Sequence, residues 1–536
     1  MKNLFIKKDL NHLIADVDAS EGKAGQKLER TLGVFNLTTL GIGAIIGAGI
    51  FSLTGAAAAH YAGPGIVYSF IIGGILCTFA GLCYAEMAAM VPVSGSAYAY
   101  SYATMGEVVA WFIGWNLILE YAFGAVTISA SWSGYFVSLL SKTLGIHLND
   151  TAMRFTRGPW EELLLSDGTL THGLWNVPAS AFALFIACVL YRGMRKSVVF
   201  NNVIVFIKIT ILTLFIVLGW SVIDPTNWFV NPDASGLSQF IPVERAVFRA
   251  GEWHNSFGWP GVLAGAGVVF FAFIGFDAVS TTAQECKNPR RDLPIGILTS
   301  LFICTLFYIL MALVITGVVN YTELGVPDPI AVGIDRIVAL REWPEWMQKS
   351  FTFVVKLGAL AGLTSGALVL SLGQTRVLYA MGRDGLLPWF DRLHNKFATP
   401  HLATVGTGIF CFISAGIMPM NQVGELVSIG TLLAFVVVCA GIPILRFTNP
   451  QTPRPFKTPV YWLVAPAGAL SCLWVMSGLP ADTWMRLAVW LFIGACVYLS
   501  YGYRNSRLRK SRPTLPNVER KNSSQAFQRV ALTEDI

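Results

Sequence analysis

Charged residues are scarce in this chain of 536 residues. Asp, Glu, Lys and Arg together make up 13% of it, about half the ~25% of an ordinary soluble protein. Apolar residues make up 54%, which is too hydrophobic for several separate soluble domains. This composition also argues against a disordered chain and against a soluble nucleic-acid-binding protein. The sequence therefore predicts a protein that lies in the lipid bilayer.

Clusters of catalytic or metal-binding residues are missing as well. The nine cysteines include no CxxC pair and no Cys/His cluster, so we expect neither a zinc site nor a disulfide framework. The seven histidines do not cluster, and no Ser/His/Asp or phosphate-loop arrangement is present. The sequence therefore argues against an enzyme, and it predicts no metal, no cofactor and no nucleic-acid partner.

Long apolar runs dominate the chain. A helix that crosses a bilayer needs ~20 mostly apolar residues, and twelve segments meet this requirement. They lie at 34–59, 65–91, 106–138, 173–191, 199–222, 258–283, 295–319, 350–374, 401–420, 424–445, 459–477 and 487–503. The sequence thus predicts an all-α membrane protein with twelve transmembrane helices.

Lys and Arg are distributed unevenly between the predicted loops. If the N-terminus is cytoplasmic, the cytoplasmic segments carry 27 of these residues and the outer loops carry nine, while Lys208 and Lys356 lie within spans. Cytoplasmic loops are enriched in Lys and Arg, so we expect a multi-pass protein of the cell (inner) membrane with both termini cytoplasmic. The net charge of +7 reflects the same bias, and an accessory subunit is left open.

The first and sixth spans contain stretches that suit a continuous helix poorly. Residues 41–51 hold four glycines within nine positions, and residues 264–277 combine small residues with a carboxylate. Each glycine costs a helix up to ~1 kcal/mol relative to alanine. Spans five apart run in opposite directions, and glycine-interrupted helices at matching places in inverted halves indicate a transporter site at the midplane. Close helix packing through Gly43 and Gly47 is the alternative for the first span.

An unwound helix frees backbone groups for a ligand. The N–H groups at one half-helix attract a carboxylate, and the carbonyls at the other accept from an ammonium group. A zwitterionic amino acid carries both groups. The backbone alone can therefore bind its main chain, while nearby side chains choose among amino acids.

Four segments resemble the amino-acid permeases of the amino acid–polyamine–organocation superfamily, in the bacterial branch of the cationic amino-acid transporter family. They are residues 41–51 (GIGAIIGAGIF), 84–100, 270–297 (beginning FFAFIGFDAVS) and 373–388 (GQTRVLYAMGRDGLLP). The resemblance implies a five-plus-five inverted repeat with broken helices 1 and 6 and two extra helices.

The same resemblance divides the chain into a core and its flanks. Residues 34–445 would form the inverted-repeat transport core of spans 1–10, and residues 446–503 the two extra spans. Residues 1–33 would be a cytoplasmic N-terminal tail, and residues 504–536 a basic cytoplasmic C-terminal tail.

The resemblance also implies roles for individual residues. The substrate carboxylate would bind the N–H groups of Ala48 and Gly49, and Phe271 would be an aromatic gate. Several relatives have Thr where this chain has Ala48, so a hydroxyl contact to the carboxylate is missing here. The carbonyls that would bind the ammonium group are those of Ile45, Ile46, Phe271, Ala272 and Ile274.

Lys208 lies nine residues into the fifth span, where an ionisable group costs ~2.5–3.5 kcal/mol. The chain resembles the proton-coupled branch, in which a lysine ammonium at this position replaces the sodium ion that bridges spans 1 and 8. The protonated side chain would hydrogen-bond carbonyls of the first span, and the neutral amine would release them. A permanently charged structural lysine is the alternative.

Further carboxylates lie within the spans. Glu120, in span 3, is a candidate proton partner or a residue of the substrate pocket, with helix packing as the alternative. For Glu86 and Asp277 we expect structural hydrogen bonds in the first place.

The sequence therefore predicts a secondary transporter that imports L-amino acids by proton symport, with the proton as the coupling ion. An exchanger without ion coupling and an amino-acid-sensing membrane protein are the alternatives. Span 8 offers mostly apolar side chains, Leu363 among them, which favours a small neutral substrate such as alanine over a cationic one. Glu120 is the candidate carboxylate for a cationic side chain.

Overall fold

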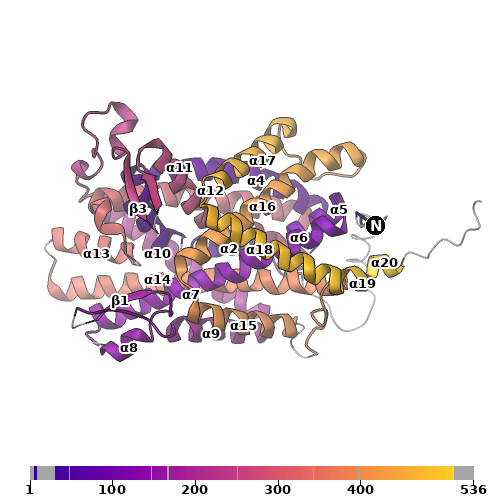
Figure 1. Cartoon of the computed structure of the whole chain (residues 1–536), viewed down its shortest axis with the longest axis horizontal. Coiled ribbons are helices and arrows are strands. Elements are labelled where there is room, and N and C mark those ends of the chain that lie inside the picture. Colours follow the sequence, from indigo (N-terminus) through magenta and orange to yellow (C-terminus); the bar gives the residue numbers. More distant parts are fainter. Residues whose placement is uncertain are drawn as a thin grey trace, which may run out of the picture.

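The computed structural model describes residues 5–8, 30–47, 49–93, 95–146, 148–165, 168–249, 252–326, 328–341, 343–395, 397 and 399–511. Most of these residues are helical, and Figure 1 shows the long helices running lengthwise through the molecule. Within the described residues, eight segments are long and apolar enough to cross a membrane, and three shorter apolar helices accompany them. The chain is therefore a helical membrane protein, as predicted.

The first half of the chain is built almost entirely from helices. Its elements are α2 (Val34–Ile45), η1 (Gly49–Leu53), α3 (Thr54–Ala57), η2 (Ala58–Ala62), η3 (Gly63–Gly65), α4 (Ile66–Met90), α5 (Ala97–Thr104), α6 (Glu107–Ile118), η4 (Leu119–Phe123), α7 (Gly124–Ser138), η5 (Leu139–Thr143), α8 (Asp150–Arg154), β1 (Glu162–Leu164), β2 (Leu170–His172), α9 (Val177–Tyr191) and α10 (Met194–Trp220).

The second half repeats this pattern of long helices and short connections. Its elements are η6 (Pro225–Asn227), η7 (Gly236–Phe240), β3 (Arg245–Arg249), β4 (Glu252–Ser256), α11 (Gly258–Val269), η8 (Phe270–Phe273), η9 (Asp277–Glu285), α12 (Pro289–Val318), η10 (Tyr321–Leu324), α13 (Pro329–Leu340), α14 (Glu345–Arg383), α15 (His401–Ile417), α16 (Met420–Thr448), α17 (Tyr461–Ser477), α18 (Ala481–Val497), η11 (Tyr498–Gly502), α19 (Tyr503–Asn505) and α20 (Arg507–Ser511).

Two helices are interrupted where the glycine-rich stretches lie. The helix α2 ends at Ile45, because Ile46 has an extended backbone with ψ of 91°. The helix α11 ends at Val269 and passes through one 3-10 turn to Ile274, which is also extended. Gly275 follows with a φ of +116°, a conformation that only glycine adopts without strain.

Two short hairpins correct the prediction of an all-α chain. Strand β1 pairs with β2, and β3 pairs with β4, both antiparallel. Both hairpins lie in loops between apolar helices, where pairing satisfies backbone groups that no helix uses. Apolar runs of about 20 residues indicate membrane spans but carry no signal for strands of three to five residues.

The two ends of the described chain lie together. Figure 1 shows α5, α19 and α20 at one end of the molecule and α13, α8 and the strands at the other. Lys8 forms an ion pair of 2.8 Å with Asp384, and the backbone N–H of Arg507 donates to the Asp384 carbonyl at 3.0 Å. Residues 5–8 and helix α20 therefore approach the same end of α14.

Two buried carboxylates hold this end of the molecule together. Glu107 is fully buried and accepts hydrogen bonds from Arg509 at 2.7 Å and from the Tyr498 hydroxyl at 2.8 Å. Glu86, 1% exposed, accepts from Arg446 at 2.7 Å. Glu107 thus joins α6 to helix α20, and Glu86 joins α4 to the end of α16.

Candidate functional site

The backbones of the two helix breaks are in close contact with each other. A Cβ atom added at Gly49 would lie 2.3 Å from the Ala272 Cα, and one added at Gly275 would lie 2.7 Å from the Ala44 Cβ. Real side chains do not approach this closely, so the contact requires glycine at both positions. Ala48, the other predicted carboxylate ligand, lies outside the described residues.

A tyrosine that the sequence analysis missed joins the two breaks. The Tyr308 hydroxyl, on α12, lies 2.7 Å from the Ile45 carbonyl oxygen and 2.6 Å from the Ala272 carbonyl oxygen. Both carbonyls are among the predicted ammonium acceptors. Each carbonyl oxygen has two lone pairs, so each can accept a second donor. The signal that could have identified it is a polar hydroxyl group within an apolar span.

Lys208 connects the first break to α14. Its Nζ donates to the Gly43 carbonyl at 3.0 Å, to the Ile46 carbonyl at 2.9 Å and to Ser365 Oγ at 2.9 Å. The side chain is fully buried, and these three acceptors match the three donors of an ammonium group. A neutral amine has only two N–H groups, so loss of the proton would remove one of the three hydrogen bonds that Lys208 donates.

The remaining predicted residues are buried around the breaks. The Phe271 carbonyl accepts from the Ile274 N–H at 3.2 Å, and the Phe271 side chain is 5% exposed. Leu363, on α14, is fully buried. Ile128, which was not predicted, lies between two helices, because Cβ atoms added at Gly47 and Gly366 would meet its Cδ1 at 3.4 and 3.0 Å.

Two carboxyl groups stand side by side next to the second break. Glu120, in the π-helical turn η4, and Asp277, at the start of η9, are both fully buried and interact with each other. Tyr121 donates to Asp277, while neither oxygen of Glu120 accepts a hydrogen bond of normal geometry. Adjacent buried carboxylates repel each other, and one proton shared between them removes that repulsion.

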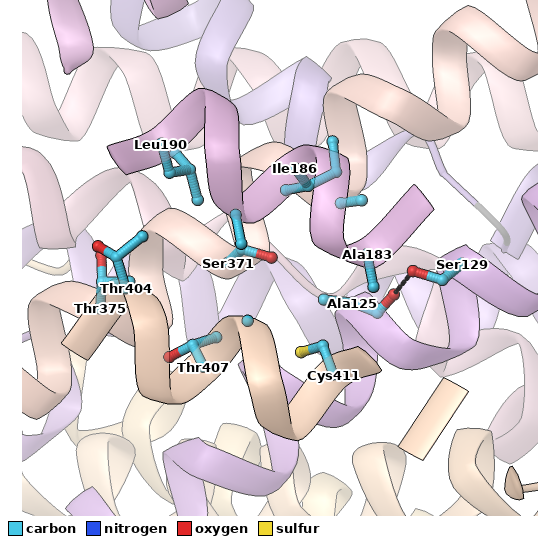
Figure 2. A pocket seen from close by; sticks show the side chains of 13 residues that line it. Ala125, Ser129, Ala183, Ile186, Leu190, Ser371, Thr375, Thr404, Thr407 and Cys411 are labelled. Carbon is cyan, nitrogen blue, oxygen red and sulfur yellow. Dashed lines mark hydrogen bonds between the residues drawn. The ribbon is translucent and has the colours of Figure 1, made fainter. Parts of the chain in front are cut away.

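A separate small cavity lies between α7, α9, α14 and α15. Figure 2 shows hydroxyl and thiol groups around it, among them those of Ser371, Thr407 and Cys411. Its volume of about 10 Å³ holds one water molecule. It is too small for an amino acid, so it is not a candidate substrate site. Among the residues that the structure describes, no group of three His, Cys, Asp or Glu side chains is arranged to hold a metal ion.

Broken helices whose free backbone groups meet inside a bundle are typical of a membrane transporter for small solutes. Comparison with known proteins agrees with this class. A model of the amino acid permease family matches residues 32–499, so the chain belongs to that family.

Several relatives cover almost the whole chain. The chain is 39% identical over 511 residues to the methylthioribose transporter of Bacillus subtilis (strain 168), covering 95% of this chain and 100% of that protein. It is 40% identical over 510 residues to the branched-chain amino acid permease BcaP of the same organism, covering 95% and 99%. Cationic amino acid transporter 2, vacuolar, of Arabidopsis thaliana is 34% identical over 438 residues, covering 81% and 63%. The predicted family is thus confirmed, and these relatives are transporters rather than enzymes.

Proposed function

We propose that this permease imports L-amino acids across the cytoplasmic membrane by alternating access, in symport with protons. The substrate carboxylate would bind N–H groups after the first break, at Ala48 and Gly49. The ammonium group would bind the carbonyls of Ile45, Ile46, Phe271, Ala272 and Ile274. No cofactor is required, because the proton gradient supplies the driving force.

The proposed architecture has twelve spans, ten of them in an inverted repeat of five plus five. The apolar segment Val34–Met90 contains 57 residues and a turn at η3, so it can cross the membrane twice. Seven further long segments and three shorter apolar helices supply the other ten crossings. Twelve crossings place both termini on the same side of the membrane, which agrees with the contacts of Lys8 and Arg507 to Asp384. The excess of Lys and Arg in the segments on that side favours the cytoplasmic side for both termini.

The observation that carries the coupling proposal is the placement of Lys208. Its ammonium group bridges the carbonyl end of α2 and Ser365 of α14, which is the expected place of a coupling cation between spans 1 and 8. Gain and loss of one proton would therefore make and break contacts between two helices that line the site. Glu120, paired with Asp277, is a second candidate for a proton that moves during transport.

The substrate that we propose is a small or medium neutral amino acid, such as alanine. Ile128 and Leu363, on the two helices that flank the first break, have apolar side chains that cannot balance a cation. The two Bacillus relatives are named as a transporter of methylthioribose and a permease of branched-chain amino acids, and none of these compounds carries a net positive charge. A cationic substrate is the alternative, with Glu120 as its partner.

Uptake into liposomes that contain the purified chain tests this proposal. We expect an inward proton gradient to drive alanine accumulation in the absence of sodium. An amino-acid exchanger would instead require substrate inside the liposomes and would ignore the gradient. A thermal-shift screen of the twenty amino acids then identifies the substrate, because a ligand raises the melting temperature only when it binds the folded protein. Stabilisation by arginine or lysine alone would overturn the neutral assignment.

A further inference from the structure

An open groove lies between η4, α16 and residues 485–493 of α18. Its volume is about 330 Å³. Leu119 and Phe123 of η4, Leu426 of α16 and Trp490 of α18 contribute apolar walls. The groove is separate from the helix breaks, and the transport site proposed above makes no use of it.

Two aromatic rings that line the groove, those of Phe123 and Trp490, are held in place by their neighbours. The Trp490 ring stacks on Trp115 with centroids 4.9 Å apart and meets Phe123 edge-on at 5.9 Å. Phe123 in turn meets Phe410 edge-on at 5.1 Å. Val489, which also lines the groove, is 54% exposed, so the groove is open to the outside of the helical bundle there. The shape of the groove is therefore fixed by the packing of these rings.

The length of the groove suits an acyl chain. The lining residues on α18 run from Met485 to Ile493, and eight helical steps of about 1.5 Å span about 12 Å. Arg486 lies in the second turn of α18, so it stands near the headgroups if α18 crosses the membrane. The groove then extends from headgroup level through most of one leaflet, whose hydrocarbon layer is about 15 Å thick.

The mouth of the groove carries one positive and one negative charge. Arg486 lies 3.7 Å from Glu425, and the two side chains are 34% and 29% exposed. Thr483 donates to Glu425 at 2.8 Å, which fixes the carboxylate. A zwitterionic headgroup complements this pair, since its phosphate can face Arg486 while its ammonium group donates to Glu425. An anionic glycerol headgroup has no ammonium group to neutralise Glu425, and a quaternary ammonium has no N–H to donate.

We propose that this groove binds one acyl chain of a phospholipid with an ethanolamine headgroup, and that the Arg486–Glu425 pair selects the headgroup. The lipid chain rests on Leu119 and Phe123, which begin and end the π-helical turn that carries Glu120. A bound lipid thus supports the turn next to the proposed transport site.

Native mass spectrometry of the full chain in detergent tests this site. The protein is mixed with phosphatidylethanolamine, phosphatidylcholine or phosphatidylglycerol of identical acyl chains, and the bound fraction is measured together with the melting temperature. We expect ethanolamine lipid to bind about fivefold more tightly than the other two, which corresponds to about 1 kcal/mol, the upper value for an exposed ion pair. It should also raise the melting temperature most.

Two variants distinguish binding of the acyl chain from selection of the headgroup. Val489→Trp fills the groove and should abolish retention of ethanolamine lipid, while Phe492→Trp, at a 70% exposed position of α18 outside the lining, should not. The double variant Glu425→Gln, Arg486→Gln should still bind lipid but lose the preference for ethanolamine. Equal binding of all three lipids by the unmodified chain, or unchanged binding by Val489→Trp, would overturn the proposal.

Discussion

Replacement of Lys208 by methionine is the most informative perturbation of the proposed coupling site. Methionine keeps the length of the side chain and removes its charge and its donors. Of the three acceptors, the Gly43 carbonyl keeps the Ser365 hydroxyl at 3.2 Å, whereas the Ile46 carbonyl and Ser365 Oγ lose the donor that Lys208 supplied. One buried carbonyl without a donor costs about 1–3 kcal/mol. Removal of a buried charge offsets part of this cost, so the variant should fold.

The functional effect should be much larger than the effect on stability. A difference of one pH unit across the membrane is worth about 1.4 kcal/mol per proton, which supports about tenfold accumulation of substrate in one-to-one symport. With the outside pH one unit below the inside pH, we expect accumulation by the unmodified chain and a ratio near one for Lys208→Met. Lys208→Arg should fail in the same way, because a guanidinium group keeps its proton.

The assay is uptake into liposomes at fixed membrane potential, with sodium replaced by choline and the outside pH varied. Lys356→Met is the matched control, since Lys356 is also a buried lysine (1% exposed) and lies on α14, nine residues before Ser365. That variant should keep the stimulation at low outside pH. Unchanged accumulation by Lys208→Met, or a strict requirement of the unmodified chain for sodium, would refute the reasoning.

Four further outcomes follow from the contacts described above. Gly49→Ala should lower both uptake and the melting temperature, because the new Cβ would overlap the Ala272 backbone. Gly47→Ala is the control and should keep the melting temperature, since its Cβ would lie at an ordinary 3.4 Å from Ile128. Tyr308→Phe removes the hydroxyl that contacts both breaks and should weaken substrate binding about fivefold, which is the effect of one hydrogen bond of about 1 kcal/mol. The affinity is measured by calorimetric titration, and an unchanged value would contradict this role. Glu107→Ala leaves Arg509 without its buried partner and should cost about 3–5 kcal/mol in thermal or denaturant unfolding, while Glu345→Ala, which breaks an exposed pair with Lys349, should change nothing measurable. Reporter tags fused at residues 1 and 536 should both be found on the cytoplasmic side, and a periplasmic tag at either end would refute the twelve-span topology.

Local sequence patterns were enough to predict the class of protein and the places where helices break. Apolar runs of about 20 residues predict membrane spans because the thickness of the bilayer sets their length. The glycines at positions 41–49 predict an interruption because glycine weakens a helix wherever it stands. Lys208 stood out because an ionisable residue deep in a span needs partners, and the first span was predicted to supply them.

The partners of most other side chains were decided only by the tertiary structure. Whether Tyr308 meets both breaks, or Glu120 meets Asp277, depends on how each helix is rotated and how far it is shifted along its neighbours. A sequence in which nearly every face of a helix is apolar carries little information about that rotation, because lipid-facing and buried residues look alike. The groove beside Trp490 has the same origin, since it exists only where three helices fail to fill the space between them.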